Sequence, residues 1–460
     1  MPYPDLKAFL ADLERSGDLV RVTRPVSPHL ELAAIVYELC NRQGTAVLFE
    51  RVEGAALPVL CNLYGTRDRV ARAIGAHQND LLRHYLQALE HPLPTKLVSD
   101  APCQEVVRSG GDLDLTALLP QIFWHPEDGG PYITMGLVIC KDPESGAQNM
   151  AIYRMQHKEG NTLGIKLQPP QHGGVCRAKA DELGRPLQVA VAIGGDPALY
   201  VGAEAVVPFG TSEMTIAGAL RGDPIEVVRA KSVDLEVPAS AEIVLEGEVL
   251  PNVLEPEGPF GEFQGYYSGS APRQVLKVHT VTHRRTPLYL ATYEGRPITN
   301  THILHAAAKE PVYFRAIKEY VCPTVRDVCV TSAGNASSHV VASIKKQAAG
   351  QGKNVLLELM KRHQVKLAVV VDEDIDPRDP MRVEWAIATR VQADRDVIII
   401  PYMAGPHLDP SQPQHPSGRG AKMGIDATMP FGNPYHTVRF PNDLLTKVRA
   451  RWRELGLPEA

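Results

Sequence analysis

Apolar residues recur at different intervals in three successive parts of the chain, and each interval predicts a different kind of structure. In the first part, apolar positions follow helical spacing, as at Leu6, Phe9 and Leu13, and such stretches alternate with short apolar runs. This alternation predicts an α/β region. Its expected helices cover residues 5–16, 29–42 and 79–90, and its expected strands cover 19–23 and 46–49.

From about residue 106 the pattern changes to short alternating segments separated by turn residues. Long helical patterns become rare, and the clearest one covers 212–220. Short strands with few helices between them predict a mainly antiparallel β domain, either a barrel or a sandwich. The expected strands cover 133–140, 149–156, 187–193, 241–249, 274–283 and 288–293.

The last part, after about residue 309, returns to alternating helices and buried strands. The stretch 406–420 is rich in Pro, Gly, Ser and His and lacks periodicity. It predicts a loop, which either orders over a site or is an ordinary exposed connection. The expected helices cover 312–321, 350–363, 381–390 and 443–455, and the expected strands cover 339–344, 366–371 and 396–400.

Composition limits the classes of function. The chain has 460 residues, of which 44% are apolar and 22% charged, with a formal net charge of −5 and a pI of about 6.4. These values are ordinary for a soluble protein of several domains. They exclude an electrostatic nucleic-acid binder, because no basic run or tail is present.

Cysteine usage and the lack of long apolar runs bear on location. The seven cysteines include no C-x-x-C pair, which argues against a zinc ribbon or a thioredoxin motif. An odd count without a signal peptide fits a reducing compartment. Because no apolar run reaches about 18 residues, we expect no membrane span and a cytoplasmic protein.

The most informative stretch, residues 255–268, reads EPEGPFGEFQGYYS. Three carboxylates, Glu255, Glu257 and Glu262, lie among prolines and glycines that exclude a helix. Carboxylates held together on a shaped loop or strand edge repel, which favours the protonated form of one of them and suits proton transfer. A solvated acidic turn is the alternative, but four aromatic residues in the same stretch favour a partly buried acid site.

Arg154 is a candidate anion-binding residue. On a strand over 149–156, it shares a face with Met150 and Ile152. Facing a pocket, its guanidinium would bind a carboxylate through two parallel hydrogen bonds. A solvated Arg on a sheet surface is the alternative.

Three other polar residues form a candidate metal site. Asn149 lies on a predicted strand, His172 in a Pro/Gly segment and Glu213 at the start of a predicted helix. This nitrogen and oxygen set suits Mn²⁺ or Mg²⁺ with a phosphate as a further ligand. The alternatives are an exposed His172, and a Glu213 that only stabilises its helix beside Ser212 as the N-cap.

Nucleotide-binding and hydrolase motifs are absent. The chain has no P-loop, no Rossmann glycine fingerprint, no H-E-x-x-H and no G-x-S-x-G. The residues by themselves therefore indicate an α/β–β–α/β protein with an acid site of Arg and carboxylates, and they leave its reaction open.

The acid stretch resembles the signature of the UbiD family of reversible (de)carboxylases. The matching residues are EGPFGEFQGYYS, 257–268, and further matching blocks lie in family order over nearly the whole chain. These blocks cover residues 124–136, 148–156, 212–222, 234–247, 344–347, 371–376 and 422–428.

This resemblance implies a fold and a set of cofactors. The implied fold has a prenylated-FMN-binding split β-barrel domain over residues 109–305. An N-terminal α/β domain (1–108) and a C-terminal α/β domain (306–460), which dimerises and walls the substrate pocket, would flank it. The resemblance also implies a flavin prenyltransferase that supplies the cofactor, a Mn²⁺ or Mg²⁺ ion on its phosphate, and a nearby K⁺ ion.

The family's functional positions can be carried over residue by residue. The catalytic Arg–Glu–Glu network falls on Arg154, Glu257 and Glu262, and the metal ligands fall on the Asn, His and Glu described above. The full set of implied cofactor-binding residues is Asn149, Ile152, Tyr153, Arg154, Gln171, His172, Pro208 and Glu213.

The implied reaction is the non-oxidative, reversible decarboxylation of an aromatic or heteroaromatic α,β-unsaturated acid. In this scheme Arg154 orients the substrate carboxylate, the cofactor acts as the electron sink, and Glu262 supplies the proton that replaces CO₂. Glu257 pairs with Arg154 and keeps the network ordered. Burial and a nearby carboxylate should favour the protonated Glu262 that this step needs.

The substrate pocket is expected beside residues 296–305 and 334–339. Asn300, His302 and His339 would give it a polar lining, which favours a hydroxylated or heteroaromatic acid. The alternative is that these residues are surface or supporting groups, in which case they give no information about the substrate.

Two other interpretations stay open. One is a metal-dependent lyase or hydrolase that works without flavin, and the other is a cofactor-binding partner subunit of a larger (de)carboxylase complex. The expected partners are a small carboxylic acid and CO₂, without nucleic acid. The expected assembly is a homodimer through the C-terminal region, or a hexamer.

Overall fold

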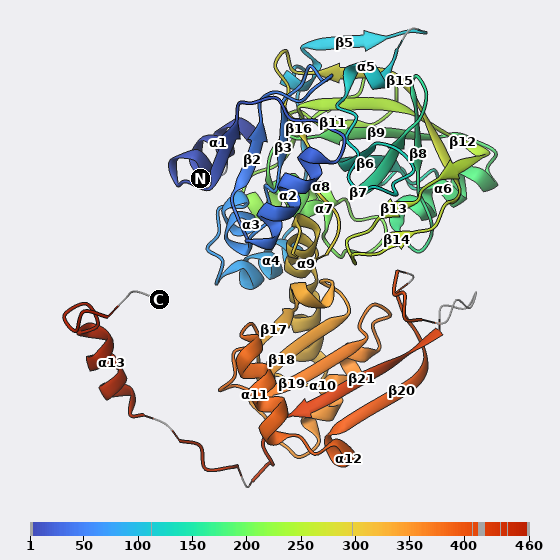
Figure 1. The fold of residues 1–460 in the computed structure, drawn as a ribbon. Coiled ribbons are helices and arrows are strands. Elements are labelled where there is room, and N and C mark those ends of the chain that lie inside the picture. The colour runs from blue at the N-terminus through green and yellow to red at the C-terminus, as the bar shows by residue number, and fades with distance from the viewer. Residues whose placement is uncertain are drawn as a thin grey trace.

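Three regions follow one another in the computed structural model, which describes all residues except 1–2, 112, 297, 407, 413–418, 433, 439 and 458–460. The N-terminal α/β region and a β-barrel pack together, and a C-terminal α/β region lies below them in Figure 1. Helix α9 (Asn300–Tyr320) connects the two parts. This confirms the α/β–β–α/β prediction and decides between a barrel and a sandwich.

The N-terminal region is a small mixed sheet with helices around it. Its strands pair in the order β1-β2-β3-β16, so β16 (Tyr289–Leu290) joins this sheet from a distant part of the sequence. The strand expected over 288–293 is therefore shorter than predicted and lies outside the barrel. The other elements are α1 (Leu6–Arg15), β1 (Leu19–Val22), α2 (Glu31–Asn41), β2 (Ala46–Phe49), β3 (Val59–Cys61), α3 (Arg67–Ala73) and α4 (Leu81–Glu90).

Six strands of the described chain close into the barrel. They pair antiparallel in the order β12-β9-β6-β7-β8-β15, and β15 pairs back with β12 to complete the ring. Strand β5 pairs with β15 beside this ring. The strands are β5 (Val106–Ser109), β6 (Tyr132–Lys141), β7 (Gln148–His157), β8 (Thr162–Ile165), β9 (Leu187–Ile193), β12 (Ile243–Glu257) and β15 (Ala271–His283).

Short elements surround the barrel. The hairpin of β13 and β14 follows β12 and carries the acidic stretch, whereas α6 and α8 begin at the predicted metal ligands. The elements are β4 (Lys96–Leu97), the 3-10 helix η1 (Pro102–Gln104), α5 (Leu115–Leu118), α6 (His172–Glu182), α7 (Ala198–Ala203), α8 (Glu213–Arg221), β10 (Glu226–Arg229), β11 (Glu236–Pro238), β13 (Phe260–Gly261) and β14 (Tyr267–Ser268).

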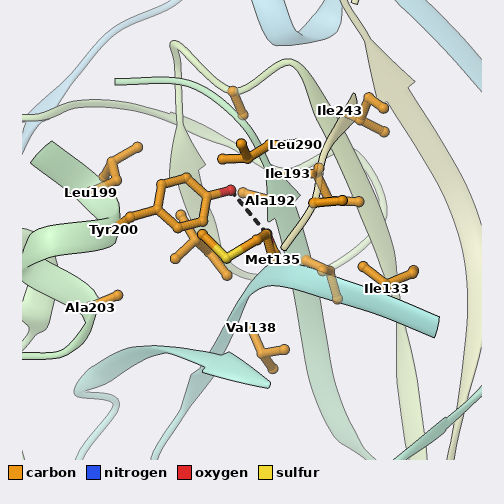
Figure 2. Close-up of a cluster of buried hydrophobic side chains, with 14 of the residues drawn as sticks. Ile133, Met135, Val138, Ala192, Ile193, Leu199, Tyr200, Ala203, Ile243 and Leu290 are labelled. Carbon is orange, nitrogen blue, oxygen red and sulfur yellow. Dashed lines mark hydrogen bonds between the residues drawn. The ribbon is translucent and has the colours of Figure 1, made fainter. Parts of the chain in front are cut away.

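One hydrophobic core joins the barrel to the N-terminal region. Figure 2 shows Tyr200 of α7 among residues of β6 and β9, with Leu290 of β16 in the same cluster. The Tyr200 hydroxyl donates to the Met135 carbonyl at 2.9 Å and accepts from the Gly194 N–H at 2.8 Å. Its polar group is thus paired although the ring is fully buried. Shared apolar contacts therefore fix the barrel wall against the N-terminal sheet.

The C-terminal region is a sheet of five described strands in the order β17-β18-β19-β21-β20. Alternate residues of β18 enter different cores: Val340 and Ala342 face the α9 and α10 side, and Val341 faces α11. The elements are β17 (Val325–Val330), the 3-10 helix η2 (Ser332–Gly334), β18 (His339–Ile344), α10 (Gln351–Met360), β19 (Leu367–Asp372), α11 (Pro380–Arg390), α12 (Ala393–Asp396), β20 (Val397–Ala404), β21 (Arg419–Ala427) and α13 (Asn442–Ala450).

Two predictions in this region were wrong in extent. Helix α9 begins at Asn300 and not at residue 312, because buried residues 306–308 hold it through Pro311, which removes a single backbone donor. The boundary predicted between 305 and 306 falls inside this helix. Strand β21 begins within the loop predicted over 406–420, of which 407 and 413–418 lie outside the described residues.

Helix α9 also ties the regions together by charge. Its buried Glu310 accepts hydrogen bonds from Arg67 of α3 at 2.9 Å and from Arg378, just before α11, at 2.7 Å. One carboxylate thus links the N-terminal and C-terminal regions through charge-assisted hydrogen bonds.

Two expectations from composition can be compared with the structure. All seven cysteines are buried and unpaired. Among the helices that the structure describes, none is long and apolar enough to cross a membrane.

The closure of the barrel depends on a glycine in β12. A Cβ atom at Gly247 would collide with the Lys277 carbonyl of β15. We therefore expect Gly247→Ala to lower the free energy of unfolding by about 1–3 kcal/mol, the usual cost of overpacking. Urea denaturation measures this loss. The matched change Gly111→Ala, where a Cβ meets nothing within 4 Å, should have no effect, and equal losses in both variants would contradict the argument.

Candidate active site

The acidic stretch folds as the end of a strand followed by a tight hairpin. Glu257 is the last residue of β12, and Glu262 directly follows β13. Between them, Gly258 has a φ of +93°, which L side chains rarely adopt. The turn brings both carboxylates to one side chain, that of Arg154 on β7. Glu255, two residues earlier, is exposed.

A second segment, residues 125–130, holds this hairpin in place. Asp128 accepts a hydrogen bond from the Gly261 N–H at 2.8 Å, and the Gly129 N–H donates to the Pro259 carbonyl at 2.8 Å. The His125 ring fills the space that a Cβ at Gly261 would occupy. The position of Glu262 is therefore set by residues far away in the sequence.

Arg154 joins the two carboxylates directly. Its Nε and Nη2 donate to the two oxygens of Glu257, each at 3.2 Å, and its Nη1 donates to Glu262 Oε1 at 2.7 Å. Glu257 is 1% exposed and Glu262 is 7% exposed. We call Arg154, Glu257 and Glu262 the acid triad. The solvated-turn alternative does not fit carboxylates this buried.

The surroundings of Arg154 favour its positive charge. Burial alone would lower the pKa of the Arg154 guanidinium, but the adjacent carboxylates of Glu262 and Glu257 outweigh burial and raise it. The guanidinium also lies 5.1 Å from the centre of the Phe260 ring. The pKa of the neighbouring Tyr132 phenol is raised by burial and by Glu257, so it remains protonated.

The three predicted metal ligands also meet. Glu213 Oε1 accepts from Asn149 Nδ2 at 2.8 Å and lies 3.4 Å from His172 Nδ1. Asn149 Oδ1 is buried without a hydrogen-bond partner, so it is free to bind a cation. These donors fit an oxygen-preferring divalent ion. Among the described residues, no group of three or more His, Cys, Asp or Glu side chains could hold a metal ion, and the set here differs in that one of its three residues is Asn.

Two local expectations at this site need correction. Ser212 precedes α8 as its N-cap residue, yet its side chain makes no capping hydrogen bond, so the structural role proposed for it is not seen. His172 is not in a loop but is the first residue of α6.

The other expected cofactor residues surround these two groups. Ile152 and Tyr153 lie on β7 between Asn149 and Arg154, half-buried and buried respectively. Gln171 is the N-cap of α6, and Pro208 is exposed before α8. The strand and the two helix starts thus provide one continuous border from the metal ligands to the acid triad.

The residues expected to line the substrate pocket divide into two places. Asn300 and His302 lie on the first turn of α9, both buried, and the His302 ring lies 5.6 Å from that of Phe263, which follows Glu262. His339 starts β18 in the C-terminal region, where its Nδ1 lies 3.1 Å from Thr331 Oγ1. No contact among the described residues joins His339 to the first two.

Sequence reasoning missed several residues that shape the site. Lys166 and Arg273 lie near Arg154, and Gln156 bonds both the Gly129 carbonyl and the Gly258 N–H. Glu294 is buried beside α9, where Thr301 donates to it at 2.6 Å. Only strand register and tertiary contacts reveal these groups, since no motif spacing marks them.

Comparison with known families identifies the chain. Family models of 3-octaprenyl-4-hydroxybenzoate carboxy-lyase match along its length: the N-terminal domain at residues 10–89, the Rift-related domain at 96–297 and the C-terminal domain at 302–427. The chain belongs to the UbiD family. The resemblance seen in the acidic stretch is thereby confirmed.

Solved structures extend this match over nearly the whole chain. The UbiD-class enzyme HmfF from Pelotomaculum thermopropionicum, in complex with FMN, is 40% identical with a TM-score of 0.90, covering 96% of this chain and 99% of its own. The vanillic acid decarboxylase of Sedimentibacter hydroxybenzoicus is 33% identical with a TM-score of 0.89, covering 99% of both chains. The 3,4-dihydroxybenzoic acid decarboxylase of Enterobacter cloacae is 30% identical with a TM-score of 0.86, covering 97% and 100%. This UbiD family member is a carboxy-lyase.

The acid triad makes a stability prediction that does not depend on turnover. Arg154→Met leaves two buried carboxylates without a counter-charge, which should lower the free energy of unfolding by about 3 kcal/mol. Urea denaturation at neutral pH measures this. Adding Glu257→Gln and Glu262→Gln removes the unpaired charges, so the triple variant should recover much of the loss. A single variant as stable as the wild type would show that the triad is not a buried charge network.

Proposed function

We propose that this UbiD family member decarboxylates, and in the reverse direction carboxylates, an aromatic or heteroaromatic α,β-unsaturated acid with prenylated FMN. The observation that carries the proposal is the acid triad: a half-buried arginine shared by two buried glutamates. The triad provides both an anion-binding group and a proton donor, the two functions that loss of CO₂ requires.

The proposed cofactor is supported by the relatives and by the donors at the metal site. HmfF was solved with FMN, and an evolved dimeric form of it with prenylated FMN. In this chain Asn149, His172 and Glu213 would hold a Mn²⁺ or Mg²⁺ ion on the cofactor phosphate. When bound, prenylated FMN supplies an electron sink for the bond that releases CO₂. A neighbouring K⁺ ion and supply by a flavin prenyltransferase belong to the same proposal.

The protein's own groups position the substrate and move the proton. Arg154 has donors beyond the three that the glutamates use, and these bind the substrate carboxylate and fix its orientation. Glu257 accepts two of its hydrogen bonds and keeps the guanidinium in place. Glu262, which follows β13 in the hairpin, delivers its proton to the carbon that loses CO₂.

Unpaired polar atoms favour a substrate with an uncharged hydrogen-bonding substituent. Both amide atoms of Asn300, His302 Nε2 and Glu294 Oε2 are buried without partners. Burial lowers the pKa of His302 to about 3. Burial and then the charges of Glu262 and Glu204 raise the pKa of Glu294 to about 8, against the hydrogen bond from Thr301. Near neutral pH both groups are uncharged, which suits a phenol or a ring N–H.

Two rival functions are separated by one experiment. The purified protein is reconstituted with prenylated FMN without oxygen and screened for CO₂ release from aromatic and heteroaromatic acids. Turnover that requires flavin removes the metal-only lyase or hydrolase. Turnover by this chain alone removes the partner-subunit interpretation. We also propose that the protein is a homodimer through the C-terminal region, and measurement of its size on the same sample tests this.

Replacement of the proton donor tests the assignment of Glu262. We expect Glu262→Gln to abolish decarboxylation, because an amide cannot deliver the proton, while the flavin stays bound, because the metal ligands are untouched. Product formation and the flavin absorption band report these two quantities. Normal turnover in this variant would contradict the assignment of Glu262 as the proton donor. Loss of the flavin band would show that Glu262 is needed for cofactor binding instead.

Substrate preference tests the role of Glu294. As a neutral donor it should be replaceable: Glu294→Gln should retain the preference for a hydroxylated over an unsubstituted benzoic acid, whereas Glu294→Leu should lose about tenfold in relative kcat/KM. In the wild type the preference should change as pH rises through about 8, because Glu294 then turns from a hydrogen-bond donor into an acceptor. In Glu294→Gln it should be independent of pH there. An unchanged preference in Glu294→Leu would contradict the assignment.

A further inference from the structure

Strand register places two more cations beside Arg154. The antiparallel pairing of β7 with β8 ends at Met155 opposite Ile165, so the next residues, Arg154 and Lys166, stand opposite each other. The pairing of β15 with β8 sets Gln274 opposite the same Ile165, which puts Arg273 beside Lys166. Residues opposite each other across neighbouring strands point to the same face of a sheet. We call Arg154, Lys166 and Arg273 the cation row.

Two members of the cation row form no ion pair among the described residues, although the register of β12 with β15 sets the exposed Glu255 opposite Arg273. Lys166 is half-buried and forms no ion pair or hydrogen bond seen among the described residues. Arg273 is half-buried as well, and its Nε is fully buried without a partner. The pKa of Lys166 is lowered, first by burial and then by the charge of Arg154, with Glu262 opposing and Arg273 reinforcing the shift. Like charges gathered in a partly dry place are unfavourable unless an anion binds there.

The charge of the acid triad explains what the row is for. One arginine is shared by two carboxylates, so Glu257 alone balances its charge when Glu262 carries the proton, and an ionised Glu262 makes the triad negative. A substrate carboxylate that approaches Arg154 therefore meets a neutral triad or net repulsion in a site of low dielectric, without net attraction in either state. Lys166 and Arg273 reverse the sign of the local charge. Together they provide the net positive charge that Arg154 alone does not provide.

The cation row lies too far from the proposed metal ligands to bind the cofactor phosphate. The ligands for a phosphate-bound metal begin at Asn149, five residues before Arg154 on β7, which is about 16 Å along an extended strand. The cation row lies at the other end of that strand, beside the proton donor Glu262. The anion that must reach this end is the carboxylate that reacts.

We propose that Lys166, supported by Arg273, binds the reacting carboxylate of the substrate and supplies the positive charge that lets it approach the acid triad. This inference rests on the proposed function and names two further binding residues for it. Because Lys166 acts on the bound acid and not on the proton, its loss weakens binding more than chemistry.

The test measures binding separately from turnover. Benzoic acid is titrated into the protein loaded with oxidised FMN, and the change in flavin absorbance gives a dissociation constant without any reaction. Loss of one charged hydrogen bond predicts that the dissociation constant of benzoic acid rises about ten- to a hundredfold in Lys166→Met. Lys166→Arg should restore most of the affinity, and Arg273→Met should weaken binding in the same direction. Lys277→Met, an exposed lysine on the same strand as Arg273, should bind as the wild type.

Turnover by the fully loaded protein gives the second readout. For Lys166→Met the account predicts a raised KM with kcat nearly unchanged. A dissociation constant within twofold of the wild type in both Lys166→Met and Arg273→Met would overturn the proposal. A lowered kcat with unchanged KM would do the same. If benzoic acid binds in this charge-dependent way but no acid is ever decarboxylated, the inference stands and the proposed function fails.

Discussion

The structure depends on one interaction, the hydrogen bonds that the Arg154 guanidinium donates to both Glu257 and Glu262. Two carboxylates that are almost entirely buried tolerate their loss of water only because a guanidinium donates to both. The barrel provides a rigid strand for the arginine, and the β12 hairpin delivers both acids to it. Removing the arginine leaves both carboxylates without a counter-charge, so stability and chemistry share the same contacts.

The rest of the fold positions these three residues with respect to a cofactor. Strand β7 carries Asn149 near one end and Arg154 nearer the other, with α6 and α8 starting at His172 and Glu213, the other two proposed metal ligands. Segment 125–130 holds the hairpin through the Asp128 carboxylate, which accepts from the Gly261 N–H, and through the Gly129 N–H, which donates to the Pro259 carbonyl. Helix α9 brings polar groups against Phe263 and ties the C-terminal region in through Glu310. The site thus lies in the barrel, beside the start of the helix that leads to the C-terminal region.

Much of this could be predicted from the sequence, and the failures have physical causes. Periodicity located α1, β9 and β18 closely, and the resemblance to the UbiD family placed Arg154, Glu257 and Glu262 before any contact was known. The start of α9 was missed because a proline signals a break, whereas burial of the preceding turn outweighed the lost donor. Lys166 carries no local signal, since its relation to Arg154 exists only in the register of β7 with β8.

The most direct test of the account is hydrogen exchange on the reaction product. A proton delivered by Glu262 must also be removable by it, so the cofactor-loaded enzyme should exchange hydrogen for deuterium at a single carbon of the decarboxylated product in D₂O. NMR locates the position. The account predicts exchange only at the carbon from which CO₂ departs, in the absence of added bicarbonate. Exchange at several carbons, or none by an enzyme that releases CO₂, would contradict a positioned proton donor.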